Sequence, residues 1–198
     1  AAKVEETARE HDYKEALAEV LTSKSLIATA RGDLILATEL LEEAELTAKQ
    51  CESNKALAAC HVAMATVLVR RGEFERSAEY SRSALEIFQT NGDLKGAGHA
   101  HRSVALYLRD QGRYKEDQEH LRAAMKCFEE FGMRRGVADV LNDLGESARH
   151  AGNLDIADQH YKSAVEIFRA LGDPEMAIPR LNRGLVMFER GRHQHARL

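Results

Sequence analysis

Histidines are the residues of this sequence whose spacing could bind a metal ion. They stand two positions apart in two pairs, His99 with His101 and His193 with His195. In a helix, residues i and i+2 point about 200° apart, so His99 and His101 cannot hold one ion together if that stretch is helical. We expect His193 and His195 to lie in a solvated loop. The sequence therefore predicts no metal site.

The three cysteines, Cys51, Cys60 and Cys127, form no C-x-x-C pair. An odd number of scattered thiols is typical of a reducing compartment, which predicts a cytoplasmic protein with small, free thiols. The sequence also contains no phosphate-binding loop, no G-x-G-x-x-G, no G-x-S-x-G and no H-E-x-x-H. We therefore expect no catalytic residues, no enzymatic activity and no cofactor.

Composition excludes two further classes of function. The 198 residues include 28 Lys and Arg against 32 Asp and Glu, a formal net charge of −4. Nucleic-acid binding needs a clustered excess of Lys and Arg to neutralise phosphates, so we expect no nucleic-acid partner. No apolar run approaches the roughly 20 residues that span a bilayer, so we expect no membrane association. Two prolines in the whole chain favour helix throughout.

A period of 40 residues organises the sequence. Four columns of residues recur at this step: Gly32, Gly72, Gly112 and Gly152; Gly92, Gly132 and Gly172; Phe88, Phe128 and Phe168; and Ala44, Ala84, Ala124 and Ala164. Another glycine, Gly191, follows the first column after 39 residues. Such columns indicate a repeat protein, in which each unit completes its core only by stacking on its neighbours.

Each unit is expected to consist of two helices. Glycines of the first column suit the left-handed residue that ends a first helix, and those of the second column suit the end of a second helix. Asp33 and Asn153 suit helix N-caps, and Glu73 suits a first helical turn. Asp173-Pro174 predicts the start of another helix. No segment alternates with period two, so we predict no strands.

Small residues mark where the paired helices should meet closely. They are Ser25, Ala65, Ala105 and Gly145 on the first helices, and Ala37, Ser77 and Ala157 on the second. Asp117 occupies the corresponding place in the third unit. We therefore expect the third repeat to be looser or wetter around Asp117.

The fourth unit makes a family resemblance visible. Its residues are Leu141-Asn142-Asp143-Leu144-Gly145-Glu146, Gly152-Asn153-Leu154, Ala157, Tyr161 and Ala164. This pattern resembles the tetratricopeptide repeat, here with a longer period similar to that of kinesin-light-chain-like, cell-polarity adaptor and bacterial regulatory proteins. The resemblance implies an all-α fold, a right-handed superhelical α-solenoid of helix hairpins.

The period assigns one array to residues 1–198. Its repeats are expected at about 13–52, 53–92, 93–132 and 133–172, with a partial repeat at 173–198. Within the partial repeat, 175–190 would form a first helix and 192–198 would begin its partner. Residues 1–10 would be the remnant of a preceding helix. Because the array is cut within a repeat at both ends, we expect a fragment of a longer protein.

The resemblance also implies a concave groove lined by set positions of the first helices. Positions in the first two repeats, among them Thr22, Thr29, Val62 and Thr66, give it a mildly apolar floor. The polar candidates for peptide binding are Arg70, His99, Arg102, Arg109, Asp139, Asn142, Glu146 and Arg149. Clustered arginines suit carboxylates or phosphorylated residues, and the amide of Asn142 suits a peptide backbone. In the alternative interpretation, Asp139 and Glu146 neutralise the arginines.

These expectations favour a protein–protein interaction scaffold that binds a partner peptide or helix in the groove, and the arginines there would suit an acidic partner. The alternative is a sensory or regulatory segment of a larger signalling enzyme, a kinase or an NTPase, or of a transcription regulator. A third possibility is weak self-association, because the uncapped ends would expose apolar helix faces.

Overall fold

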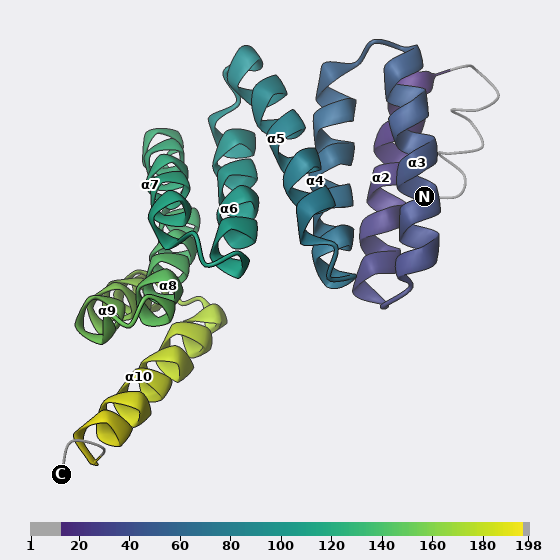
Figure 1. The fold of residues 1–198 in the computed structure, drawn as a ribbon. Coiled ribbons are helices and arrows are strands. Elements are labelled where there is room, and N and C mark those ends of the chain that lie inside the picture. Colours follow the sequence, from purple (N-terminus) through teal and green to yellow (C-terminus); the bar gives the residue numbers. More distant parts are fainter. Residues whose placement is uncertain (1–12, 196–198) are drawn as a thin grey trace. The chain divides into compact units, whose positions relative to one another are not determined.

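The computed structural model describes residues 13–195, and within that range every regular element is a helix (Figure 1). The helices are α2 (Lys14–Ala30), α3 (Leu34–Gln50), α4 (Asn54–Arg70), α5 (Phe74–Asn91), α6 (Leu94–Asp110), α7 (Tyr114–Phe131), α8 (Arg134–His150), α9 (Leu154–Leu171), the short 3₁₀ helix η1 (Pro174–Met176) and α10 (Ala177–His195). The all-α fold is confirmed. The helix expected at 1–10 lies outside the described residues.

The chain forms two compact units, which divide after Tyr107. In the first unit, α2 packs on α3, α3 on α4 and α4 on α5, and the two first helices α2 and α4 also contact each other. In the second unit, α7 packs on α8, α8 on α9 and α9 on α10, with a further contact between α8 and α10. Helices α2, α3, α4, α8 and α9 thus pack against more than their own hairpin partners, as expected for stacked repeats.

The glycines end the helices where the sequence predicts. Gly72 follows the first helix α4 with φ +76°, and Gly92 ends the second helix α5 with φ +68°. At the end of α5 the backbone amide of Asp93 donates to Phe88 O at 2.9 Å, which satisfies a carbonyl that the helix leaves unpaired. A residue with a Cβ would be strained at these angles. Five further glycines of the two columns have positive φ: Gly32, Gly112, Gly132, Gly152 and Gly172.

The N-caps agree with the sequence in part. Asp33 accepts a hydrogen bond from Leu36 N at 3.1 Å, and Asp173 accepts one from Glu175 N at 2.9 Å, with Pro174 at the first helical position. Asn153 is the N-cap residue of α9, as predicted, although its side chain makes no capping hydrogen bond. Glu73 is itself the N-cap residue and not part of the first turn. Its carboxylate is bound instead by Arg71, whose Nε lies 2.6 Å away, and by Arg76.

The last helix differs from the expectation. α10 continues through Gly191 to His195, so no turn separates a first helix from its partner there. The backbone at His193 and His195 is therefore helical, and the prediction of a loop is wrong. Gly191 lacks the positive φ of the turn glycines.

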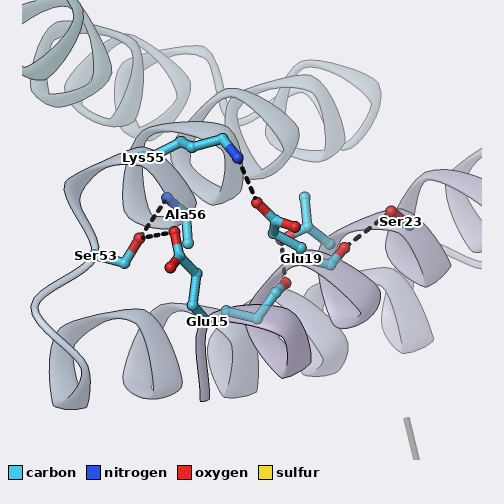
Figure 2. A network of polar contacts seen from close by, with 8 residues as sticks. Glu15, Glu19, Ser23, Ser53, Lys55 and Ala56 are labelled. Atoms are coloured by element: carbon cyan, nitrogen blue, oxygen red, sulfur yellow. Dashed lines mark hydrogen bonds and ion pairs between the residues drawn. The ribbon is translucent and has the colours of Figure 1, made fainter. Parts of the chain in front are cut away.

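Polar contacts join α2 to the start of α4, as Figure 2 shows. The Ser53 hydroxyl accepts from Ala56 N at 3.2 Å, which caps α4, and donates to Glu15 Oε1 at 2.9 Å. The Lys55 ammonium donates to Glu19 Oε1 at 2.8 Å. The carboxylate of Glu15 lies near the N-terminus of α4, where the helix dipole favours negative charge.

The small residues lie where neighbouring helices approach most closely. Ala65 and Ser77 are both 1% exposed, and the Ser77 hydroxyl donates to Ala65 O at 2.9 Å across the hairpin of α4 and α5. In the hairpin of α8 and α9, a Cβ placed on Gly145 would lie 2.6 Å from the ring of the fully buried Tyr161. The absence of a side chain at Gly145 therefore makes room for the ring of Tyr161.

We predict that Gly145→Ala destabilises the protein and that Gly184→Ala does not. An alanine in a helix interior normally adds about 0.5–1 kcal/mol of stability over glycine. At Gly184 a Cβ meets nothing within 4 Å, so this gain is expected in full. At Gly145 the buried ring of Tyr161 has to shift, and overpacking of this kind costs about 1–3 kcal/mol.

Urea unfolding of both variants measures this difference. A Gly145→Ala protein as stable as Gly184→Ala would show that the ring of Tyr161 does not depend on Gly145.

Candidate binding face

The surface formed by the first helices carries most of the candidate residues, and we call it the first-helix face. In the first unit it consists of α2, α4 and α6 up to Tyr107. In the second unit it consists of Leu108–Asp110, α8 and α10.

A cavity of about 340 Å³ opens in the first unit. Its lining residues come from three helices: Val62 and Thr66 from α4, Ser81 from α5, and His99, Ala100 and Ser103 from α6. Thr66 is exposed, whereas Ser81 and Ala100 are buried, so Thr66 lies toward the mouth and the other two form the floor. Val62, Thr66 and His99 are positions that the sequence assigns to the groove. Ser81, from a second helix, is not.

The hydroxyl groups of the cavity bond to one another and to the backbone. Thr66 donates to Val62 O at 3.0 Å, and Ser81 Oγ lies 2.8 Å from Ser77 O and 2.7 Å from Ser103 Oγ. Because Ser81 has one proton, a chain in which Ser103 donates to Ser81 and Ser81 donates to Ser77 O satisfies both contacts.

His99 is half-buried at the wall of this cavity. Burial lowers the pKa of its imidazole, and the positive charges of Arg102 and Lys95 lower that pKa further, whereas Asp93 raises it. The ring is therefore neutral at pH 7.

Two further candidates belong to the first unit. Arg102 is half-buried on α6. Arg70 is directed toward a neighbouring helix. Its Nη1 donates to Thr29 O at 3.0 Å, which joins α4 to α2. The guanidinium group thus forms a structural contact between two first helices.

The second unit brings three candidates together, Arg109, Asn142 and Glu146. Arg109 Nη1 donates to Asp143 O at 3.0 Å, and its Nη2 lies 3.2 Å from Glu146 Oε2, with the Arg109 side chain 10% exposed. Asn182 Nδ2 donates to Asn142 Oδ1 at 3.0 Å and to Glu146 Oε1 at 3.4 Å. Asn142 is thereby engaged within the protein through its amide oxygen. Asp139 is half-buried on the same helix.

Arg149 on α8 forms an ion pair with the next first helix, α10, as Arg109 on α6 does with α8. Its Nη1 donates to Glu189 Oε1 at 2.9 Å, which joins α8 to α10. Neither Glu189 nor Asn182 is among the residues predicted from the sequence. Both stand 40 residues after their partners Arg149 and Asn142, so extending the period into the last helix could have found them.

A buried polar group lies beside this network. Asp117 on α7 is fully buried, and among the described residues its two carboxyl oxygens have no hydrogen-bond partner. Burial raises the pKa of Asp117 to about 6; Ser147 and Arg109 oppose this shift, and Asp143 and Glu146 add to it. The disturbance expected at Asp117 therefore takes the form of a buried, poorly satisfied carboxyl group and not of solvent exposure.

The described thiols are free, and no cluster of three His, Cys, Asp or Glu residues within 13–195 could hold a metal ion. Burial raises the pKa of Cys60 to about 12, and its Sγ donates to Leu41 O at 3.2 Å. Such a thiol is a poor nucleophile. No helix in the described part of the chain has the length and apolar character needed to cross a bilayer.

Helix hairpins that stack on one another within each unit define a repeat protein. The sequence pattern of the tetratricopeptide repeat matches residues 97–170 and 136–198. The chain belongs to the tetratricopeptide repeat family. No sequence among curated proteins matches it.

Solved structures share the fold. BtubC (BKLC) from P. vanneervenii is 21% identical with a TM-score of 0.81, and the alignment covers 99% of this chain and 84% of BtubC. A Rap protein complexed with competence and sporulation factor is 16% identical with a TM-score of 0.80, covering 92% of this chain and 51% of Rap. A signal transduction ATPase with a tetratricopeptide repeat sensor, from Pyrococcus horikoshii, is 14% identical with a TM-score of 0.70. The alignment covers 86% of this chain and 25% of the ATPase. This chain thus spans about half of the Rap chain.

We predict that Asp117→Ala increases stability at pH 8 more than at pH 4. The pKa of Asp117 in the folded protein is about 6, against 3.8 for an unburied aspartate, so ionisation disfavours the folded state. This penalty is absent below pH 4, develops between pH 4 and 6, and is complete above pH 6, where it reaches about 2–3 kcal/mol. The cost of the cavity left by alanine is the same at every pH.

The free energy of unfolding in urea, measured from pH 4 to pH 8, tests this. Glu119→Ala, an exposed change on the same helix, is the control and should show little pH-dependent difference from the parent protein. An equal effect of Asp117→Ala at all pH values would mean that Asp117 titrates normally.

Proposed function

We propose that this chain is a protein-interaction segment that holds a peptide or helix of a partner protein against its first-helix face. The observation that carries the proposal is the cavity of about 340 Å³ in the first unit, since three of its lining residues occupy groove positions of the repeat. A cavity of this size accepts a side chain of a partner. Binding of this kind involves no catalytic step.

Family membership and the likeness to Rap support the proposal. The Rap structure shows this fold in complex with another factor. We also propose a cytoplasmic location, on the basis of the three free thiols.

The arginine contacts favour a partner that is not recognised mainly through its charge. Arg109 and Arg149 are already paired with Glu146 and Glu189, and Arg70 with a backbone carbonyl. An acidic partner would have to displace these groups. We therefore propose that shape and neutral hydrogen bonds provide most of the recognition.

A second candidate function is a sensory segment of a larger signalling protein. The likeness to a signal transduction ATPase with a tetratricopeptide repeat sensor favours it, since this chain corresponds to 25% of that protein. The flanking sequence of the parent gene tests this candidate. A kinase, NTPase or DNA-binding domain there would support it, whereas further repeats alone would contradict it.

We predict that Thr66→Arg weakens partner binding at least tenfold, because the longer side chain fills the mouth of the cavity. The ligands are random dodecapeptides displayed on phage and selected on the whole chain, and their affinities are measured by fluorescence polarisation. Thr90→Arg is the matched control, since Thr90 is also exposed on a helix and also donates to the carbonyl four residues earlier.

The two variants separate specific from general effects. Binding lost equally in both, or in neither, would place the peptide away from the first-helix face. Circular dichroism of each variant verifies that the helices remain folded.

A further inference from the structure

We propose that the cavity between α4, α5 and α6 recognises a primary carboxamide, the side chain of an asparagine or glutamine in the bound partner. This inference rests on the proposed function, because it names the side chain that anchors the partner. It follows from the donors and acceptors of the wall, the surrounding charge and the volume.

The hydroxyl groups of the wall present acceptors. The proton of Thr66 is used at Val62 O, and Ser81 Oγ lies within hydrogen-bond distance of both Ser77 O and Ser103 Oγ. Because one hydroxyl proton cannot serve both contacts, we assign the proton of Ser81 to Ser77 O and that of Ser103 to Ser81 Oγ. With these three protons used inside the protein, the hydroxyl lone pairs remain for an occupant. The three hydroxyl groups of the wall therefore favour a group that donates hydrogen bonds.

Charged occupants match this wall poorly. A carboxylate only accepts hydrogen bonds. Thr66, Ser81 or Ser103 could donate to it only by giving up its present hydrogen bond to Val62 O, Ser77 O or Ser81. A lysine or arginine would supply donors, but His99 stands on a helix that also carries Lys95 and Arg102, whose positive charges already act on its ring. A neutral donor avoids both costs.

Among neutral groups, a carboxamide supplies the most donors. An aliphatic side chain would leave the acceptors of Thr66 and Ser103 unpaired, which lowers affinity roughly tenfold or more. A hydroxyl offers one proton, whereas a carboxamide offers two N–H groups and keeps its oxygen for water at the mouth. The methyl groups of Val62 and Ala100 cover its aliphatic stem.

The volume fits one such side chain. The cavity measures about 340 Å³. A water molecule takes about 30 Å³ of liquid, so the space corresponds to roughly ten waters. This accommodates the carboxamide and stem of an asparagine or glutamine and leaves the mouth open to the partner's backbone.

The first experiment uses the selected dodecapeptides whose binding Thr66→Arg abolishes. Each asparagine and glutamine is replaced by aspartate or glutamate, which keeps the shape and removes the N–H donors. On the parent protein we expect one replacement to weaken binding at least tenfold. On the Thr66→Val and Ser103→Ala variants the same replacement should weaken binding threefold or less, because the hydroxyl oxygen that accepts from the carboxamide is already missing.

Matched variants provide the controls. Thr90→Val and Ser23→Ala remove hydroxyls outside the cavity that make the same bond to the carbonyl four residues earlier, and both should retain the full tenfold effect. Peptides that depend on Thr66 but tolerate every such replacement would overturn the carboxamide proposal and leave the proposed function intact. The absence of any peptide that depends on Thr66 would overturn both.

A second experiment needs no peptide. Acetamide, acetate and methylammonium are each titrated into the full chain while methyl NMR signals of Ala100 and Val62 are followed. We expect acetamide to shift these signals and the two ions to leave them in place, with the acetamide shift reduced at least threefold in Thr66→Val. Larger shifts with acetate or methylammonium than with acetamide would overturn the proposal.

Discussion

A hairpin of two helices in this chain has more apolar surface than its own interface can cover, and this constraint governs the rest of the structure. Leu21, Leu41, Met64 and Leu68 belong to one core cluster, although they come from three different helices. Close approach of those helices depends on small side chains such as Ala37 and Ala65, and in the second unit on Gly145 beneath Tyr161. Stability therefore comes from contact between neighbouring repeats as well as from within each one.

Polar contacts between successive first helices accompany this packing. Arg70 reaches α2, Arg109 reaches α8, and Arg149 reaches α10. In each case the guanidinium group bonds to a carbonyl or carboxylate on another first helix. The same residue types that favour anion binding in the sequence thus contribute to the structure of the array. The cavity beside Ser81 and His99 is one part of the first unit's face with room for a ligand.

The fold could be predicted well from the sequence, because the ends of the helices depend on the backbone preferences of a few repeated residues. Positive φ at Gly72 and Gly92 and the caps at Asp33 and Asp173 are local properties of a few residues. The helix through Gly191 was missed, since a glycine alone does not distinguish a turn from a helix interior. Side-chain pairing was harder to predict: whether Arg149 meets solvent, a ligand or Glu189 depends on rotamers that only packing decides. Ser81 was missed because the family pattern assigns the groove to first helices.

Two of the arginine contacts end on main-chain oxygens, Thr29 O and Asp143 O. Every amino acid carries that oxygen, so these bonds place no demand on which side chain stands at either position. Mutation can therefore change the chemical character of the surface at both places while the helices stay joined. The contacts between helices are thus independent of the surface side chains at these two positions. New binding preferences can therefore arise there without loss of the fold.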